Sequence, residues 1–115
     1  MLPRSRRLYT ERQLRTVLRT GRTTRGQHLV IRWKANHLSR HRFGFIVGRR
    51  SARRAVDRNS LKRRLRHAAS TVVAGPPHAD VVVTVQPTAI AQPPHQLTEE
   101  FHRLCRYALR PTSRR

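Results

Sequence analysis

The chain has 115 residues, of which 26 are lysine or arginine and 5 are aspartate or glutamate, so its formal net charge is +21. A compact state with this charge repels itself, so the composition indicates a polyanionic partner whose phosphates neutralise the basic side chains. The length suits one domain with a modest core, the single cysteine excludes an internal disulfide and a cysteine zinc cluster, and no aliphatic stretch is long enough to cross a bilayer.

A first helix is predicted over residues 10–20. Thr10 can cap its free amides, and Gln13, three residues later, completes a capping box. Gly21 suits the C-terminal end of this helix. The helix carries one apolar stripe, made of Leu14, Val17 and Leu18.

Two strands are predicted next. Apolar and polar residues alternate over residues 28–35 and again over 42–48, as in half-buried strands. The polar loop over 36–41 favours their pairing as an antiparallel hairpin. A short strand over 22–25 is predicted to precede them.

A second helix is predicted after a basic connector over residues 49–56. Asp57 or Asn59 can cap it, and the Gly-Pro-Pro sequence at 75–77 ends the element. One face is apolar and consists of Leu61, Leu65, Ala68 and Val72. The opposite face is polar and basic and consists of Asn59, Lys62, Arg63 and Arg66.

The valine-rich residues 80–86 predict a strand that is buried on both faces. A loop over 87–94 leads to a last helix over 97–109, and the basic tail over 111–115 is expected to be disordered. The order of elements indicates a two-layer α/β sandwich, of the α+β type, on a small mixed sheet. The path from strand 42–48 through the basic helix to strand 80–86 resembles a crossover unit.

The basic face of the second helix is the main functional signal. Solvated helix faces usually mix charge signs, but this helix has no acid after Asp57, and like charges at successive turns repel one another. The pattern therefore favours binding of an RNA or DNA backbone. The connector extends this surface toward the helix N-terminus through Arg49, Arg50, Arg53 and Arg54.

Other partners fit this pattern less well. The basic residues are spread over the whole chain rather than along one amphipathic helix, which argues against a membrane surface. No second helix follows a tight turn around residues 58–70, which argues against a helix-turn-helix DNA repressor. The early arginines precede no apolar stretch, so no secretory signal is expected and a cytoplasmic protein is the default.

A groove for single-stranded nucleic acid is the second candidate site. Gly44 and Gly48 would leave backbone uncovered on the exposed face of the hairpin, where a chain can approach closely. The neighbouring strand contributes His28, Val30 and Arg32 to this face. The apolar stripe of the first helix either lines the groove or belongs to the core.

No self-sufficient active site is expected. The five acids are scattered, and no pair is placed for acid–base work or for a two-metal site. His37 and His41 lie in a loop without a third ligand type, so neither catalytic nor metal-binding residues are predicted. Cys105 lies close to the apolar face of the last helix and fits the core better than the role of a nucleophile.

Several stretches resemble the protein subunit of bacterial ribonuclease P. "LRTVLRTGR" is similar to the first helix of that family, "ADVVVTVQP" to its last strand and "LTEEFHRLCRYAL" to its last helix. "RFGFIVGRRSARRAVDRNSLKRRLRHA" resembles the signature stretch, in which a glycine-containing strand leads through a basic pair to an Arg-Asn-Arg helix.

The resemblance implies a fold of order αβββαβα, like the second domain of ribosomal protein S5, over residues 1–110. It also implies a left-handed crossover, whereas generic rules favour a right-handed one. The implied activity is that of a ribonucleoprotein endonuclease that removes the 5′ leader of precursor tRNA. In such a particle the RNA subunit is the catalyst and binds most of the Mg2+. A general or ribosomal RNA-binding protein is the alternative.

The resemblance also implies two sets of binding residues, in a 1:1 complex with ribonuclease P RNA and without membrane or DNA partners. The RNA-subunit site would comprise Arg49, Arg50, Arg53, Arg54, Arg58, Asn59, Lys62, Arg63 and Arg66. The cleft for the precursor leader would comprise Leu14, Leu18, His28, Val30, Arg32, Gly44 and Ile46.

Two departures from the family pattern stand out. Ser60 replaces the second arginine of the Arg-Asn-Arg sequence, so one charged contact is missing. Leu14 and Leu18 occupy positions that usually carry aromatic residues facing the leader, so base stacking is expected to be weaker.

Overall fold

The computed structural model describes residues 7–8, 10–38, 40–72 and 78–109. The tail over 111–115 and the Gly-Pro-Pro sequence at 75–77 lie outside the described residues. The elements are α1 (Glu11–Thr20), β1 (Arg22–Arg25), β2 (Leu29–Ala35), β3 (Arg42–Val47), α2 (Ala55–Ala69), β4 (Ala79–Val85), the 3-10 helix η2 (Pro87–Ala91) and α3 (Pro94–Ala108). Their order confirms the predicted αβββαβα fold.

The four strands form one mixed sheet in the order β1-β2-β4-β3. β2 pairs antiparallel with both β1 and β4, while β3 pairs parallel with β4. The predicted hairpin between β2 and β3 is therefore wrong, because β4 lies between them. The valines of β4 are buried on both faces of the sheet. A central position removes the most apolar surface of such a strand from water, and this burial stabilises the fold. The crossover from β3 through α2 to β4 is confirmed, and its hand stays a prediction.

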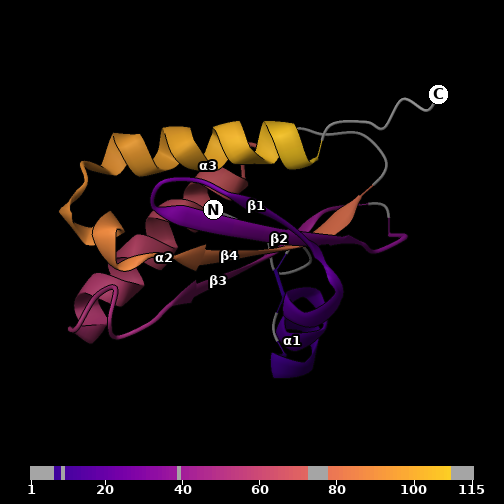
Figure 1. The fold of residues 1–115 in the computed structure, drawn as a ribbon, viewed down its shortest axis with the longest axis horizontal. Coiled ribbons are helices and arrows are strands. Elements are labelled where there is room, and N and C mark those ends of the chain that lie inside the picture. Colours follow the sequence, from indigo (N-terminus) through magenta and orange to yellow (C-terminus); the bar gives the residue numbers. More distant parts are fainter. Residues whose placement is uncertain (1–6, 9, 39, 73–77, 110–115) are drawn as a thin grey trace.

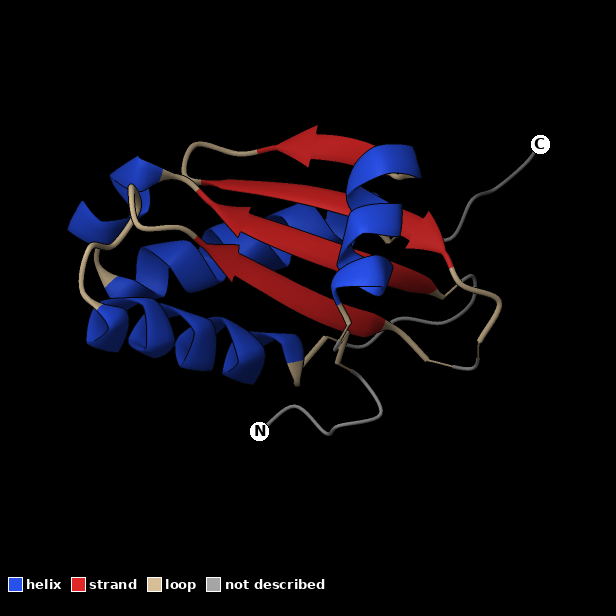
Figure 2. Ribbon diagram, turned by 90° about the horizontal axis from the view of Figure 1, so that it is seen from below, coloured by secondary structure: helices blue, strands red, loops and turns tan. Residues whose placement is uncertain are grey.

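The helices form layers on both sides of this sheet (Figure 1). α2 and α3 cover one face, and their larger core cluster includes Phe43, Phe45 and Phe101, whose ring centroids lie 6.1–6.4 Å apart. α1 packs on the opposite face, seen in front of the strands in Figure 2. Val17 of α1 forms a smaller core cluster there with Leu8 and with Val82 of β4. The molecule therefore presents two separate helical surfaces with a sheet between them.

One edge strand of the sheet is short, and the other edge is partly covered by a neighbouring segment of the chain. β1 forms one edge with only four residues, Arg22, Thr23, Thr24 and Arg25. At the other edge, the Leu8 amide donates to the Phe43 carbonyl oxygen at 2.8 Å, next to a parallel bridge between Arg7 and Phe43.

The start of α1 follows its sequence signals. Thr10 Oγ1 accepts the Gln13 amide, and Gln13 Oε1 accepts the Thr10 amide, both at 3.1 Å, which confirms the capping box. Gly21 closes the helix in an extended conformation, with φ −80°. A Cβ there would lie 2.6 Å from the Val17 carbonyl oxygen and 2.8 Å from that of Trp33. Close backbone approach, not a left-handed turn, therefore requires glycine at this position.

Two predicted helix starts are wrong. α2 begins at Ala55 with Arg54 as its N-cap, so neither Asp57 nor Asn59 caps it. Asp57 instead lies in the first turn, where it pairs with Arg54 at 3.1 Å. The predicted loop over 87–94 contains η2, and α3 begins at Pro94, because proline is well suited to the first helical position.

None of the helices in the described ranges is long and apolar enough to span a bilayer.

Candidate nucleic-acid interface

The outer face of α2 presents a row of basic side chains on a fixed helix. Leu61 and Leu65 are buried against the sheet and anchor the helix. On the other side, Asn59 and Arg63 are exposed, while Lys62 and Arg66 are half-buried. Lys62, Arg63 and Arg66 form no ion pair within the described chain, so no described carboxylate neutralises the charge of the row.

The basic turn over residues 48–54 precedes this row and is held by specific hydrogen bonds. The amides of Ser51 and Ala52 both donate to the Gly48 carbonyl oxygen at 3.1 Å. The buried Ser51 hydroxyl donates to the Val85 carbonyl oxygen at the end of β4 (2.6 Å). These hydrogen bonds hold the side chains of the turn beside the N-terminus of α2. The exposed side chains are Arg49, Arg50, Arg53 and Arg54.

Two of the predicted RNA contacts also have partners inside the protein. Arg58 Nη1 donates to the carbonyl oxygens of Ala52 (3.0 Å) and Arg53 (2.8 Å). Arg54 pairs with Asp57, and this hydrogen bonding raises the pKa of the Arg54 guanidinium. Arg58 thus holds the turn in place, and the charge of Arg54 is partly neutralised.

The opposite face of the sheet carries the predicted cleft beside α1. Leu14 and Leu18 of α1 and Ile46 of β3 are half-buried around the small α1 cluster. Arg32 and His28 are half-buried on the adjoining sheet, and Val30 is buried. Val82 and Thr84 of β4 lie between the β2 and β3 members of this set, since Thr84 is in register with both Val30 and Ile46. The predicted hairpin paired β2 directly with β3, so Val82 and Thr84 of β4 were not expected in the cleft.

Gly44 does not supply the open backbone that was predicted. A Cβ at this position would collide with Leu14 Cδ2 and lie 3.3 Å from Leu8 Cβ, so the glycine is covered by the side chains beneath α1. Gly48 is the open glycine of the pair, since a Cβ added there would meet no atom within 4 Å. The role of Gly44 is therefore to let α1 approach the sheet.

Replacing Gly44 with valine is expected to lower the free energy of unfolding by about 1–3 kcal/mol, because overpacking must displace Leu14 and Leu8. Urea denaturation measures the change. Gly48→Val is the matched control, and its effect should stay within about 0.5 kcal/mol, as for most surface substitutions. Equal losses in both variants would rule out crowding beneath α1 as the cause.

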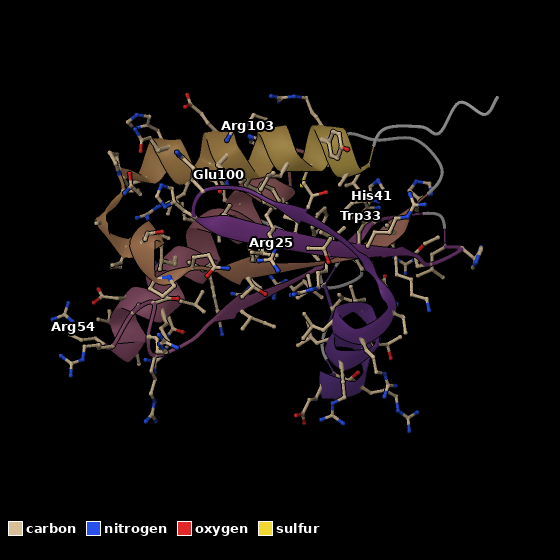
Figure 3. The ribbon with its side chains drawn as sticks, viewed as in Figure 1. Arg25, Trp33, His41, Arg54, Glu100 and Arg103 are labelled. Carbon is tan, nitrogen blue, oxygen red and sulfur yellow. The ribbon has the colours of Figure 1, made fainter. Side chains whose placement is uncertain are left out.

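Glu100 makes a structural contact that the sequence pattern did not reveal. Its side chain points from α3 toward the β1–β2 hairpin (Figure 3), and Oε2 accepts the amides of His28 and Leu29, both at 2.8 Å. His28 Nδ1 also lies 2.7 Å from Thr88 Oγ1 of η2. A carboxylate from the α3 layer thus fixes the segment that carries His28. The available signal was its spacing, three residues after Leu97 and four before Leu104 on the buried face.

Asp80 organises the other end of the sheet. Its carboxylate accepts two hydrogen bonds from Arg42, at 2.8 and 2.7 Å, and one from Asn36 Nδ2 at 2.9 Å. The hydrogen bonding with Asp80 raises the pKa of the Arg42 guanidinium. This pair ties the loop after β2 to β3 and β4.

Within the described ranges, no three histidine, cysteine, aspartate or glutamate side chains gather as a metal site would require. The exposed Glu11 pairs with Arg15, while Asp57, Asp80 and Glu100 serve the contacts described above. Cys105 is buried in the larger core cluster, which confirms its predicted place, and this burial raises the pKa of its thiol to about 12. The geometry of the described residues therefore suits binding of a polyanion.

Comparisons with known proteins agree with this architecture. A family model described as Ribonuclease P matches residues 2–109. A ribonuclease P protein component of Acidothermus cellulolyticus is 36% identical over 107 residues, which cover 90% of this chain and 88% of the relative. The corresponding protein of Kocuria rhizophila is 32% identical over 111 residues, which cover 96% of this chain and 97% of the relative.

Solved structures share the fold at lower identity. The RNase P protein of Staphylococcus aureus superposes with a TM-score of 0.80 at 18% identity, covering 90% of this chain and 94% of that one. The RNase P protein from Thermotoga maritima gives a TM-score of 0.73 at 22% identity, covering 85% of this chain and 93% of that one.

Proposed function

Since the chain belongs to the family of ribonuclease P protein components, the protein subunits of a tRNA-processing ribonucleoprotein, we propose that it binds the catalytic RNA subunit and the 5′ leader of precursor tRNA. The observation that carries this proposal is the unneutralised basic row on α2 beside the turn over 48–54. Both elements are anchored, so their cations form a surface of fixed shape. Such a surface gains affinity for a folded RNA by releasing its condensed counterions.

The α1 face is proposed to hold the leader. It combines half-buried apolar side chains of α1 with Arg32 and His28 on the sheet, a mixture that suits an unpaired strand. Arg54 beside α2 and the helix α1 lie far apart in Figure 3. The protein would therefore contact two RNAs through different surfaces and reduce the repulsion between them.

Catalysis and most Mg2+ binding are assigned to the RNA subunit in this proposal. The described carboxylates do not form a magnesium site among themselves, since Asp57, Asp80 and Glu100 each serve a structural contact. The protein residues instead bind and orient RNA. One protein molecule per RNA subunit is proposed.

Cleavage of precursor tRNA by ribonuclease P RNA at low magnesium is expected to accelerate when the protein is added. The physical reason is that basic side chains replace part of the magnesium that screens the phosphates of two RNAs. Cleavage rates with and without protein measure the effect, and high magnesium should diminish it. The protein alone is expected to leave the substrate intact.

Unchanged cleavage at low magnesium, with RNA binding retained, would identify a general RNA-binding protein instead. In the same particle, a photo-cross-linker on Leu18→Cys reports on the α1 cleft. Cross-links to leader nucleotides are expected, and cross-links only to the mature tRNA would refute the cleft assignment.

A further inference from the structure

A groove of about 720 Å³ lies between α2 and α3, separate from the α1 face. Its α2 side carries Ser60, Arg64 and His67 at successive turns, and Thr98 of α3 faces them. The small side chain of Ser60 leaves the groove open at its first turn. Arg63 and Arg66 of the outer row also line the groove, so it is continuous with the surface already described.

The two helices hold this groove at a set width. His102 Nε2 of α3 lies 3.0 Å from Thr71 Oγ1 and 3.1 Å from the Ala68 carbonyl oxygen, at the C-terminal end of α2. Leu65 and Phe101 are fully buried beneath the helices. The groove is therefore preformed, and a ligand does not need to separate α2 from α3.

The charge in the groove is strongly positive. Three arginines line it and no carboxylate does. Within the described chain, Arg63, Arg64 and Arg66 form no ion pair, whereas the nearest acid of α2, Asp57, is already paired with Arg54. The guanidinium groups are thus available to bind a phosphate in bidentate fashion.

The hydroxyl groups of the groove suit an RNA backbone in particular. Ser60 and Thr98 offer oxygen atoms that both donate and accept, and Asn59 adds an amide of the same kind. An RNA backbone presents phosphate oxygens, which accept, and 2′-hydroxyl groups, which also donate. A single inorganic anion would use only a small part of a groove of this volume.

We infer that the backbone of the RNA subunit continues from the outer face of α2 into this groove, where Arg64 binds a phosphate between Ser60 and Thr98. The inference rests on the proposed function and extends it to α3, for which the sequence pattern indicated no role in RNA binding. Arg64 becomes an RNA-binding residue, and Thr98 marks the far wall of the site.

Cross-linking from Thr98→Cys in the assembled particle tests the position of the RNA. A thiol-directed photo-cross-linker attaches selectively at position 98, because Cys105 is buried and its pKa of about 12 keeps it protonated at neutral pH. Arg103→Cys, on the exposed side of α3, is the matched control. Cross-links to the RNA subunit are expected from position 98 at much higher yield than from 103. Equal yields, or cross-links to precursor tRNA alone, would overturn the inference.

Binding measurements separate this inference from the proposal on which it depends. Arg64→Ala is expected to weaken RNA-subunit binding about tenfold, as for one lost charged hydrogen bond, and to reduce the slope of log affinity against log salt by about 0.7–0.9. Arg103→Ala removes the same charge outside the groove and should change neither quantity. If Lys62→Ala weakens binding and Arg64→Ala does not, only the groove is refuted. If neither variant weakens binding, the proposed α2 interface fails as well.

Discussion

Simultaneous replacement of Lys62, Arg63 and Arg66 by alanine is expected to weaken binding to the RNA subunit by about 10²- to 10³-fold. The slope of log affinity against log salt should become shallower by about 2–3, since each lost phosphate contact removes roughly 0.7–0.9 of the slope. Filter binding over a series of salt concentrations measures both quantities. The free energy of unfolding should change little, because Leu61 and Leu65 still anchor α2.

The matched control removes equal charge from another part of the molecule. Arg12 and Arg19 of α1 and Arg22 of β1 are exposed, and their triple alanine variant lowers the net charge by the same amount. The slope of log affinity against log salt is expected to change less in this variant than in the triple variant of α2. Equal losses in the two triple variants would show that overall charge, and not the α2 row, determines affinity.

Replacing Glu100 with alanine is expected to lower the free energy of unfolding by about 2–5 kcal/mol. The substitution leaves the buried Leu29 amide and the part-buried His28 amide without their acceptor, and an unsatisfied buried donor costs about 1–3 kcal/mol. Urea denaturation measures the loss. Glu100→Gln keeps one acceptor oxygen, so its free energy of unfolding should fall less than that of Glu100→Ala.

Glu99 provides the matched control for this prediction. It is the neighbouring carboxylate on α3, and it is exposed whereas Glu100 is buried. Glu99→Ala should change stability by less than about 0.5 kcal/mol. Similar losses of stability in Glu99→Ala and Glu100→Ala would mean that the hydrogen bonds from the β1–β2 hairpin to Glu100 do not contribute to the free energy of unfolding.

Local signals predicted the elements of this chain better than their arrangement. The capping box of α1 and the strand β2 were predicted from residues close in sequence, and both are confirmed. The half-buried character expected of β2 is wrong for its first half, because Leu29, Val30 and Ile31 are all buried between helices on the two faces of the sheet. The pairing of β2 with β4 is a long-range choice that depends on burial of β4 on both faces. The continuous valines of β4 carried that information, but the short loop after β2 favoured a hairpin.

The same distinction applies to the candidate sites. The basic face of α2 follows from helical periodicity alone, so the sequence predicts which residues share it, and their role in RNA binding stays a prediction. The cover over Gly44 depends on where α1 crosses the sheet, and the groove beside Arg64 depends on how α3 packs against α2. Neither relation is encoded within one element. By contrast, the sequence spacing of Glu100 from Leu97 and Leu104 already places it on the buried face of α3.

The edges of the sheet have a consequence for the protein before it meets RNA. An exposed strand edge is a template for pairing with another chain, and proteins oppose this by keeping edge strands short, charged or covered. Here β1 is short and has an arginine at each end, and the β3 edge is occupied by the segment at Arg7 and Leu8. A newly made molecule is thereby protected against edge-to-edge aggregation by features that do not depend on its RNA partner.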